Sequence, residues 1–311
     1  MNPGTGKYEQ LLERCAPLEP VPTAVVFPCE PSALAGAIEA GEKGLIVPIL
    51  VGPTAKIQQI AHSSSINLDG AQLVDMPDSN TSAAKAVELV REGRAELLMK
   101  GSLHTDELLG AVVAKTTGLR TGRRISHAFL MDIPAYHKIL VITDAAINIA
   151  PNLEEKADIC QNAIDLSISL GREIPKVAIL AAVETVTSKM PATIDAAALC
   201  KMADRGQITG GILDGPLAFD NAISRQAAQI KKIRSAVAGD PDIVLAPDLE
   251  AGNILAKQLI YLANASSAGL VLGARVPIIL TSRSDSVSSR IASCAVGMLV
   301  VHARCESPVA Q

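Results

Sequence analysis

Short apolar runs alternate along this chain with longer segments of helical periodicity, and that order predicts a parallel sheet covered by helices. Residues 23–27 are the first candidate strand, and residues 31–43 follow as a helix. Residues 45–51 form a second candidate strand, after which Pro53 begins another helix, because its ring is tolerated in the first turn. The chain therefore starts in βαβα order.

A later helix has a recognisable beginning. Asn152 stands three residues before Glu155, a spacing that allows the two residues to cap each other's backbone N–H groups. Strands predicted at 138–143 and 177–181 lie on either side of this helix. Its apolar residues recur at helical spacing, at Ala157, Cys160, Ile164 and Ile168. The alternation of strand and helix thus continues into the second half of the chain.

Length and apolar content predict two domains. The chain has 311 residues, of which 49% are hydrophobic and 19% are charged, so it buries a sizeable core and is long for one domain. We predict a first α/β domain at 1–133 plus 269–311, with a second α/β domain, 134–268, inserted into it. The sequence has no repeat or Pro-rich linker, and we place the boundary near Ile133–Pro134 with a return near Gly269.

Composition argues against a nucleic-acid partner. Aromatic residues make up 2% of the chain and Trp is absent, which leaves little for the stacking that holds single strands. The net charge of −4 removes a general attraction to DNA. Any anionic ligand must therefore be held by local cations.

The chain carries no pattern of a membrane or secreted protein. Residues 1–14 include charged side chains and no apolar core, and the apolar windows at 268–280 and 294–301 are too short or interrupted to cross a bilayer. The six cysteines show no CxxC pairing, which favours free thiols. We expect a cytoplasmic protein without a membrane partner.

Motifs for metals and cofactors fail on context. The five histidines form no HExxH or other metal-ligand pair, so we predict no metal site. Gly4–Lys7 looks like part of a P-loop, but Tyr8 stands where a Ser or Thr holds magnesium. No GxGxxG follows a predicted strand. We therefore expect no cofactor.

The most informative polar cluster follows the apolar run 276–280. Ser282, Arg283 and Asp285 place a hydroxyl, a fixed cation and a carboxylate within four residues. The carboxyl ends of strands are where open α/β sheets bind ligands, and the guanidinium of Arg matches phosphate with two prongs. The cluster favours phosphate chemistry, although a polar loop closing a strand explains the same residues.

A second cluster follows the run 97–99. Its residues include Lys100, Ser102 and Thr105, and a glycine and hydroxyls ahead of a helix from Asp106 bring backbone donors to an anion. A loop with a helix cap at Thr105 is a compatible alternative.

Three further polar segments follow predicted strands or loops, at 143–148, 214–222 and 247–253. Together with the first two clusters, they resemble the phosphate acetyltransferase and phosphate butyryltransferase family in order and spacing, over about residues 23–303. Segments 118–151 and 214–222 look closer to the butyryl branch, which implies that butyryl-CoA is used at least as efficiently as acetyl-CoA.

The resemblance implies a two-domain fold like that of isocitrate and isopropylmalate dehydrogenases, usually a homodimer, with the active site in the interdomain cleft. It also implies the reaction: acyl-CoA and phosphate give acyl phosphate and CoA, by direct transfer in a ternary complex. Coenzyme A is a substrate here, and no cofactor is needed. A carboxylate takes the proton of the CoA thiol, and the thiolate attacks the acyl phosphate carbonyl.

Catalytic roles follow from the resemblance. Arg283 would neutralise phosphate, and Ser282 would hydrogen-bond the thiol or the tetrahedral oxygen. In the acetyl branch the base is an Asp, but Ser289 stands at the matching position of this sequence. We therefore expect Asp285 to act as the base instead. Arg283, two residues away, would lower the pKa of Asp285 unless burial offsets the effect. The expected substrate-binding residues are Lys100, Ser102, Thr105, Arg120, Asp144, Asn148 and Asn253. Arg120 belongs to a basic cluster with Arg123 and Arg124, which would grip CoA phosphates or form a solvated loop.

Two other function classes stay open at this point. A metal- and NAD-dependent dehydrogenase has the same architecture, but it needs a convergent carboxylate site that Asp240 and Asp242 alone do not provide. A non-catalytic acyl-CoA or phosphate-binding protein would retain Ser282 and Arg283 while lacking a base.

Overall fold

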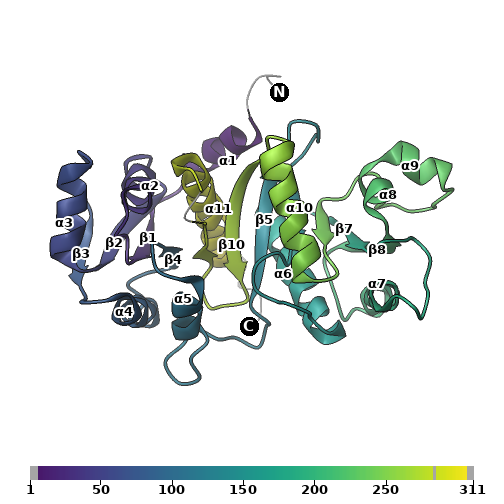
Figure 1. Ribbon diagram of the computed structural model, residues 1–311, viewed down its shortest axis with the longest axis horizontal. Helices are drawn as coiled ribbons and strands as arrows, with labels where there is room; N and C mark the ends of the chain where they lie inside the picture. Colours follow the sequence, from purple (N-terminus) through teal and green to yellow (C-terminus); the bar gives the residue numbers. More distant parts are fainter. Residues whose placement is uncertain (1–5, 283–284, 307–311) are drawn as a thin grey trace. The chain divides into compact units, whose positions relative to one another are not determined.

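Two compact units make up the chain, which a computed structural model describes at residues 6–282 and 285–306. One unit consists of Met1–Arg123 and Ala268–Gln311, and Arg124–Ser267 forms the other. The first and last helices that the structure describes, purple and yellow in Figure 1, thus belong to the first unit. The division comes at Arg123, whereas the sequence pattern placed it near Ile133–Pro134. The difference arises because the strand Ser126–Asp132 pairs with a strand of the second unit.

Strands of the first unit form a mostly parallel sheet in the order β3-β2-β1-β4-β11-β10. Only the β10–β11 pair is antiparallel among the pairs described in this unit. The buried strands are nearly continuous apolar runs, as expected where helices cover both faces. The strands are β1 (Val21–Val26), β2 (Ile46–Gly52), β3 (Gln72–Asp75), β4 (Leu97–Lys100), β10 (Ser266–Leu272) and β11 (Ile278–Ile279).

Helices of the first unit cover both faces of this sheet. Because parallel crossovers are right-handed and the strand order reverses after β3, the helix between β3 and β4 lies on the opposite face from the helix between β1 and β2. The C-terminal helix α11 packs against α1 and α2, while α4 packs against α5. The helices are α1 (Lys7–Cys15), α2 (Pro31–Glu42), α3 (Thr54–Ser63), α4 (Ser79–Arg91), α5 (Thr105–Val112) and α11 (Val287–Glu306).

Strands of the second unit lie in the order β5-β6-β9-β7-β8. Strand β5 pairs antiparallel with β6, and the other described pairs are parallel. The strands are β5 (Ser126–Asp132), β6 (Leu140–Thr143), β7 (Lys176–Leu180), β8 (Ile212–Leu217) and β9 (Ile243–Leu245). The helices are α6 (Leu153–Ser169), α7 (Pro191–Asp204), α8 (Phe219–Ile223), α9 (Arg225–Ile230) and α10 (Leu249–Leu262).

Helix α6 begins as its sequence predicts. Asn152 Oδ1 accepts from the N–H of Glu155 at 2.9 Å, and Glu155 Oε2 accepts from the N–H of Asn152 at 3.0 Å. The predicted apolar stripe is only partly right, because Cys160 and Ile164 are buried but Ile168 is 41% exposed. The mixed α/β class is confirmed, and within the described residues no helix has the length and apolarity to span a bilayer.

Gly101 allows β4 to end against β1. A Cβ atom at Gly101 would lie 2.5 Å from the Phe27 carbonyl oxygen and would also collide with the carbonyl of Val26. Gly110, in α5, has nothing within 4 Å of its Cβ position. The two glycines therefore form a matched pair for substitution.

We expect Gly101→Ala to lower the free energy of unfolding by about 1–3 kcal/mol, because backbone atoms must move apart. Gly110→Ala should raise it by about 0.5–1 kcal/mol, since alanine loses less entropy in a helix. Urea unfolding midpoints of both variants check this. Equal midpoints would show that the contact between β1 and β4 relaxes without cost.

Candidate active site

Three strands of the first unit, β1, β4 and β11, end at one edge of the sheet. In the parallel register Val26 of β1 lies beside Lys100 of β4, and Met99 of β4 lies beside Ile279 of β11. The polar segments that follow these strands, 27–30, 100–105 and 280–285, therefore start next to one another. This is the edge at which open α/β sheets bind ligands.

Ser102 joins the loops after β1 and β4. Its Oγ donates to the carbonyl of Phe27 at 2.8 Å and accepts from the N–H of Cys29 at 3.0 Å. The N–H of Ser102 donates to the same Phe27 carbonyl at 2.9 Å. Ser102, which the sequence placed among substrate-binding residues, thus shapes the loop after β1.

Helix α5 begins immediately after this loop. Thr105 is its first residue, and the cap is His104, whose N–H donates to Glu107 Oε2 at 2.7 Å. The cap predicted at Thr105 is therefore wrong by one residue, because Glu107 reaches back to His104. Glu107 Oε1 also accepts from Ser79 Oγ at 2.6 Å, which ties α5 to α4.

The loop after β11 closes on itself. The N–H of Ser282 donates to Asp285 Oδ2 at 2.6 Å, and the N–H of Asp285 donates to the Ser282 carbonyl at 3.1 Å. Arg283, the predicted phosphate ligand, lies outside the described residues together with Ser284. The structure thus describes the two ends of the predicted catalytic motif.

Asp285 is half-buried, and burial raises the pKa of its carboxyl above the usual value. The Ser282 N–H and the positive charges of Arg290 and Lys100 act in the opposite direction without cancelling the effect. Lys100, at the end of β4, is only 4% exposed. A buried cation therefore lies near a carboxylate that holds its proton more tightly than an ordinary Asp.

A second group of predicted residues gathers in the second unit, around Asp144 after β6. The buried carboxylate of Asp144 accepts from the N–H groups of His127, Ala146 and Ile147 at 2.8–3.1 Å. Asn148 Nδ2 donates to the same carboxylate at 2.5 Å. Asp144 therefore organises its own loop through four hydrogen bonds.

The neighbours of Asp144 are equally well bonded. Asn148 also donates to the Ile125 carbonyl at 2.9 Å and accepts from Arg124 Nε at 2.7 Å. Asn253, on α10, donates to the Ala145 carbonyl at 2.9 Å. Asp144, Asn148 and Asn253, which are distant in sequence, thus lie in one hydrogen-bonded cluster.

Arg124 lies at the rim of a cavity of about 240 Å³ beside this cluster. Its Nη1 contacts Glu155 Oε1 at 2.7 Å. The cavity is lined by Arg124, Ile147, Asn148, Ile149, Ala150, Pro151 and Glu155. The basic cluster predicted from sequence is divided, because Arg120 belongs to the first unit, where it is exposed and its backbone pairs with Ala274.

Comparison with known proteins places the chain in a family. The family profile described as Phosphate acetyl/butaryl transferase matches residues 78–298. The phosphate acetyltransferase of Rhizobium meliloti is 60% identical to this chain, and the match covers 98% of this chain and 96% of the relative. The chain belongs to this family. Its predicted class, a phosphate acyltransferase, is thereby confirmed, and the dehydrogenase alternative is not supported.

A solved structure gives the same fold. The branched-chain phosphotransacylase from Enterococcus faecalis V583 is 29% identical, with a TM-score of 0.79 over 90% of this chain and 99% of that chain. The predicted family architecture is therefore confirmed for this transferase.

The predicted lean toward the butyryl branch is not supported. The phosphate butyryltransferase of Clostridium beijerinckii is 39% identical over 94% of this chain and 97% of the relative, well below the 60% of the acetyltransferase. The physical reason is that a resemblance carried by polar segments at strand ends says little about an apolar acyl chain. A few methylene groups of acyl chain are distinguished by pocket shape, which such motifs do not encode.

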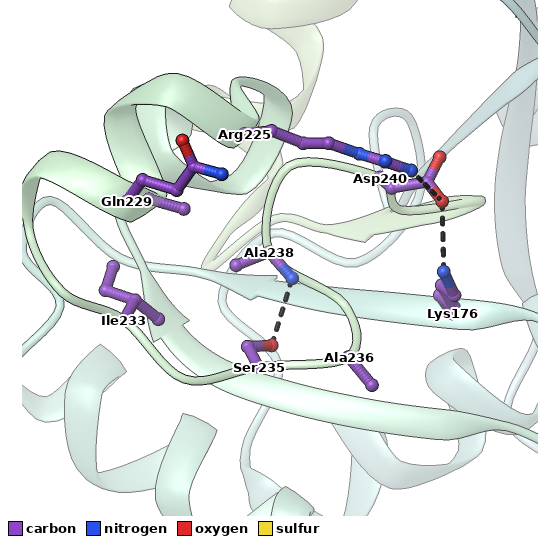
Figure 2. Close-up of a pocket in the computed structure, with 9 residues that line it drawn as sticks. Lys176, Arg225, Gln229, Ile233, Ser235, Ala236, Ala238 and Asp240 are labelled. Carbon is purple, nitrogen blue, oxygen red and sulfur yellow. Dashed lines mark hydrogen bonds and ion pairs between the residues drawn. The ribbon is translucent and has the colours of Figure 1, made fainter.

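Asp240 and Asp242, considered above as a possible metal site, are bound by cations at the amino ends of β7 and β9. Figure 2 shows Asp240 between Lys176 and Arg225, whose nitrogens lie 3.0 and 3.1 Å from Asp240 Oδ2. Lys138 Nζ lies 2.8 Å from Asp242 Oδ1. These carboxylates therefore act as anions in a salt-bridge network of the transferase.

The network has a clear electrostatic signature. Burial raises the pKa of Asp240, but Lys176 and Lys138 outweigh it and hold that pKa well below the usual range. The hollow of about 270 Å³ in Figure 2 is lined by the same Lys176, Arg225 and Asp240. Because the Lys176 and Arg225 side chains that line this hollow already contact Asp240, we interpret it as a feature of the fold and not as a ligand site.

Sequence reasoning missed three residues at the first site. Cys29 and Glu30 follow β1 at the same edge, and Arg290 of α11 is buried beside the loop after β11. The sequence held a signal for Cys29 and Glu30, because they follow an apolar strand, which is the pattern that identified the other clusters. Arg290 carried none, since an Arg in a serine-rich segment is typical of a solvated helix.

Proposed function

We propose that this enzyme transfers an acetyl group, or another short acyl group, between coenzyme A and inorganic phosphate. The observation that supports it most directly is the loop 281–285 at the end of β11, where Asp285 has a raised pKa beside the buried cation of Lys100. Family membership supplies the reaction type, and this loop supplies a base and a local charge.

The mechanism uses the side chains of this loop. In the direction of acyl-CoA synthesis, Asp285 takes the proton of the CoA thiol, and the thiolate attacks the carbonyl carbon of acyl phosphate. The hydroxyl of Ser282 donates to the tetrahedral oxygen, and phosphate leaves as the carbonyl re-forms. In reverse, phosphate attacks acyl-CoA, and the departing thiolate recovers the proton from Asp285.

Phosphate has to be held by local cations, because the chain is acidic overall. We assign this role to Arg283, whose planar fork matches phosphate oxygens, and to Lys100. A raised pKa suits Asp285 for its task, since a base closer to the pKa of a thiol accepts its proton more readily.

Transfer through an acyl-cysteine is disfavoured by the state of the nearby thiols. Burial raises the pKa of Cys29 above its usual value, although the charge of Lys56 opposes it. Burial also raises the pKa of Cys294 to about 12. Thiols that stay protonated at neutral pH are poor nucleophiles. Direct transfer in a ternary complex is therefore the route that we propose.

The remaining residues have roles in binding. Thr105 and the N-terminus of α5 offer backbone donors to a phosphate group, and Arg120 offers charge to the phosphates of CoA. Asp144 and Asn148 shape the loop that carries the rim of the 240 Å³ cavity. We propose that no metal or redox cofactor takes part, and that the enzyme works in the reducing cytoplasm, where its free cysteines are stable.

A homodimer is the assembly that we propose, formed through α10. Ile254, Tyr261 and Leu262 of this helix are 58%, 70% and 81% exposed. Spacings of seven and eight residues place them along one side of the helix. An apolar stripe of this kind suits the self-complementary contact of a twofold dimer.

Turnover tests the function. With phosphate, chelator and no nicotinamide, we expect CoA release from acetyl-CoA with kcat/KM at least equal to that from butyryl-CoA. Each additional methylene group offers only about 0.8 kcal/mol of burial, so propionyl-CoA should lie between them. Binding of acyl-CoA without turnover would instead identify the chain as a non-catalytic binding protein.

Arg283 and Asp285 should differ in kinetics. Arg283→Lys should lower kcat/KM about tenfold or more, a cost of about 1.4 kcal/mol, because the planar fork is lost. Asp285→Asn should lower kcat across neutral pH with little change in the phosphate KM, and alkaline pH should restore part of the rate as CoA ionises unaided. Steady-state pH profiles measure both effects.

Matched controls are exposed residues of the same types. Arg234→Lys and Asp204→Asn should leave kcat and KM unchanged. An unchanged kcat in Asp285→Asn at every pH would place the base on another carboxylate.

The dimer proposal makes a separate prediction. Light scattering should give twice the chain mass for the wild type and a lower mass for Leu262→Glu, because a charge in the apolar contact is costly. Ile230→Glu, at a residue of α9 that is 73% exposed, is the control and should stay dimeric. A monomeric wild type at micromolar concentration would refute the dimer.

A further inference from the structure

Arg290 is the most deeply buried charged side chain among the described residues, with 1% of its surface exposed. It lies in the first turn of α11, just after the loop that carries Ser282 and Asp285. Burying a guanidinium is costly unless hydrogen bonds and opposite charges compensate. Its partners therefore indicate why the charge is there.

The hydrogen bonds of Arg290 go to the two residues at the start of this loop. Nη1 donates to Thr281 Oγ1 at 2.6 Å, and Nη2 donates to the Ser282 carbonyl at 3.0 Å. The same carbonyl also accepts from the N–H of Asp285. Arg290 thus holds the carbonyl group of Ser282, to which the backbone of Asp285 is also hydrogen-bonded.

The charges around Arg290 are those of the candidate site. Burial lowers the pKa of the guanidinium, while the negative charges of Asp285 and Glu30 raise it. Among the residues that the structure describes, the groups that face Asp285 are Arg290, the Ser282 N–H and Lys100. Arg290 is therefore joined to the predicted base both by geometry and by charge.

The first unit leaves room for this side chain through a glycine. A Cβ atom at Gly36 of α2 would lie 2.6 Å from Cδ of Arg290 and 3.1 Å from its Cβ. An alanine at this position would push against the aliphatic stem of Arg290 without changing its charge. Gly36 therefore offers a second way to disturb Arg290.

We propose that Arg290 is a positioning residue for acyl transfer, which orients the Ser282 hydroxyl and the Asp285 carboxylate by holding the loop that carries them. This inference rests on the proposed function. A methionine of similar length would fill the same space without the cost of a buried charge, so burial alone gives no reason for a guanidinium. The two bonds to Thr281 and Ser282 give that reason.

Two substitutions separate the geometry from the charge. Arg290→Met removes both, so kcat should fall about tenfold or more, and the acidic limb of the kcat profile should move to higher pH because Asp285 loses a nearby positive charge. Arg290→Lys keeps the charge but not the two-pronged bond. Its acidic limb should stay near that of the wild type while kcat remains reduced.

Gly36→Ala tests the same residue without touching its chemistry. We expect a reduced kcat with an unmoved acidic limb, and Gly110→Ala, on the open side of α5, should behave as the wild type. KM values for phosphate and CoA should change by less than about threefold in every variant, because the positioning acts on the transferring groups. Thermal melting monitors folding, and Gly36→Ala keeps the test decisive if Arg290→Met does not fold.

The outcomes are distinct. A wild type that turns over no acyl-CoA would overturn the proposed function and this inference together. An active wild type whose Arg290→Lys and Gly36→Ala variants melt earlier but keep kcat and the pH profile would overturn the inference alone. Loss of kcat in these variants, with the acidic limb moved only in Arg290→Met, would establish it.

Discussion

The parallel pairing of β1, β4 and β11 is the constraint on which the candidate site depends. Three segments far apart in sequence end at one edge of the sheet only because Val26 pairs with Lys100 and Met99 with Ile279. Gly101 lets the backbones approach closely enough for Ser102 to hold the loop after β1. Without this register the hydroxyls, cations and carboxylate of the three loops would be unrelated.

The balance between burial and pairing gives carboxylates of the same type opposite properties. At Asp285 burial outweighs the nearby cations, so its pKa is raised, whereas at Asp240 the cations outweigh burial and the pKa is lowered. A carboxylate of the first kind takes up a proton more readily than an ordinary Asp, while one of the second kind keeps its negative charge and stabilises the fold. The positions agree with this division, because Asp285 follows the carboxyl end of β11 and Asp240 precedes β9.

In the second unit, polar residues of a predicted binding segment hold the conformation of their own loop. The carboxylate of Asp144 accepts hydrogen bonds from three backbone N–H groups and from Asn148. Asn253 connects α10 to the same loop. Buried polar groups that satisfy one another in this way make a loop rigid. The rim of the adjacent cavity, which includes Asn148 and Arg124, is positioned by these bonds.

The sequence by itself determined the alternation of strands and helices, the capping of α6 by Asn152 and Glu155, and the family, because periodicity, caps and strand-end motifs are local patterns. For the same reason it singled out the segment of Ser282 and Asp285 as a candidate site, which stays a prediction. Only the tertiary structure decided which polar groups face one another: the hydroxyl of Ser102 serves Phe27, Glu107 caps at His104, and Asp240 binds lysines. It also decided that Arg290 is buried. These outcomes depend on burial and on partners distant in the chain, and neither is encoded in the spacing of residues along a segment.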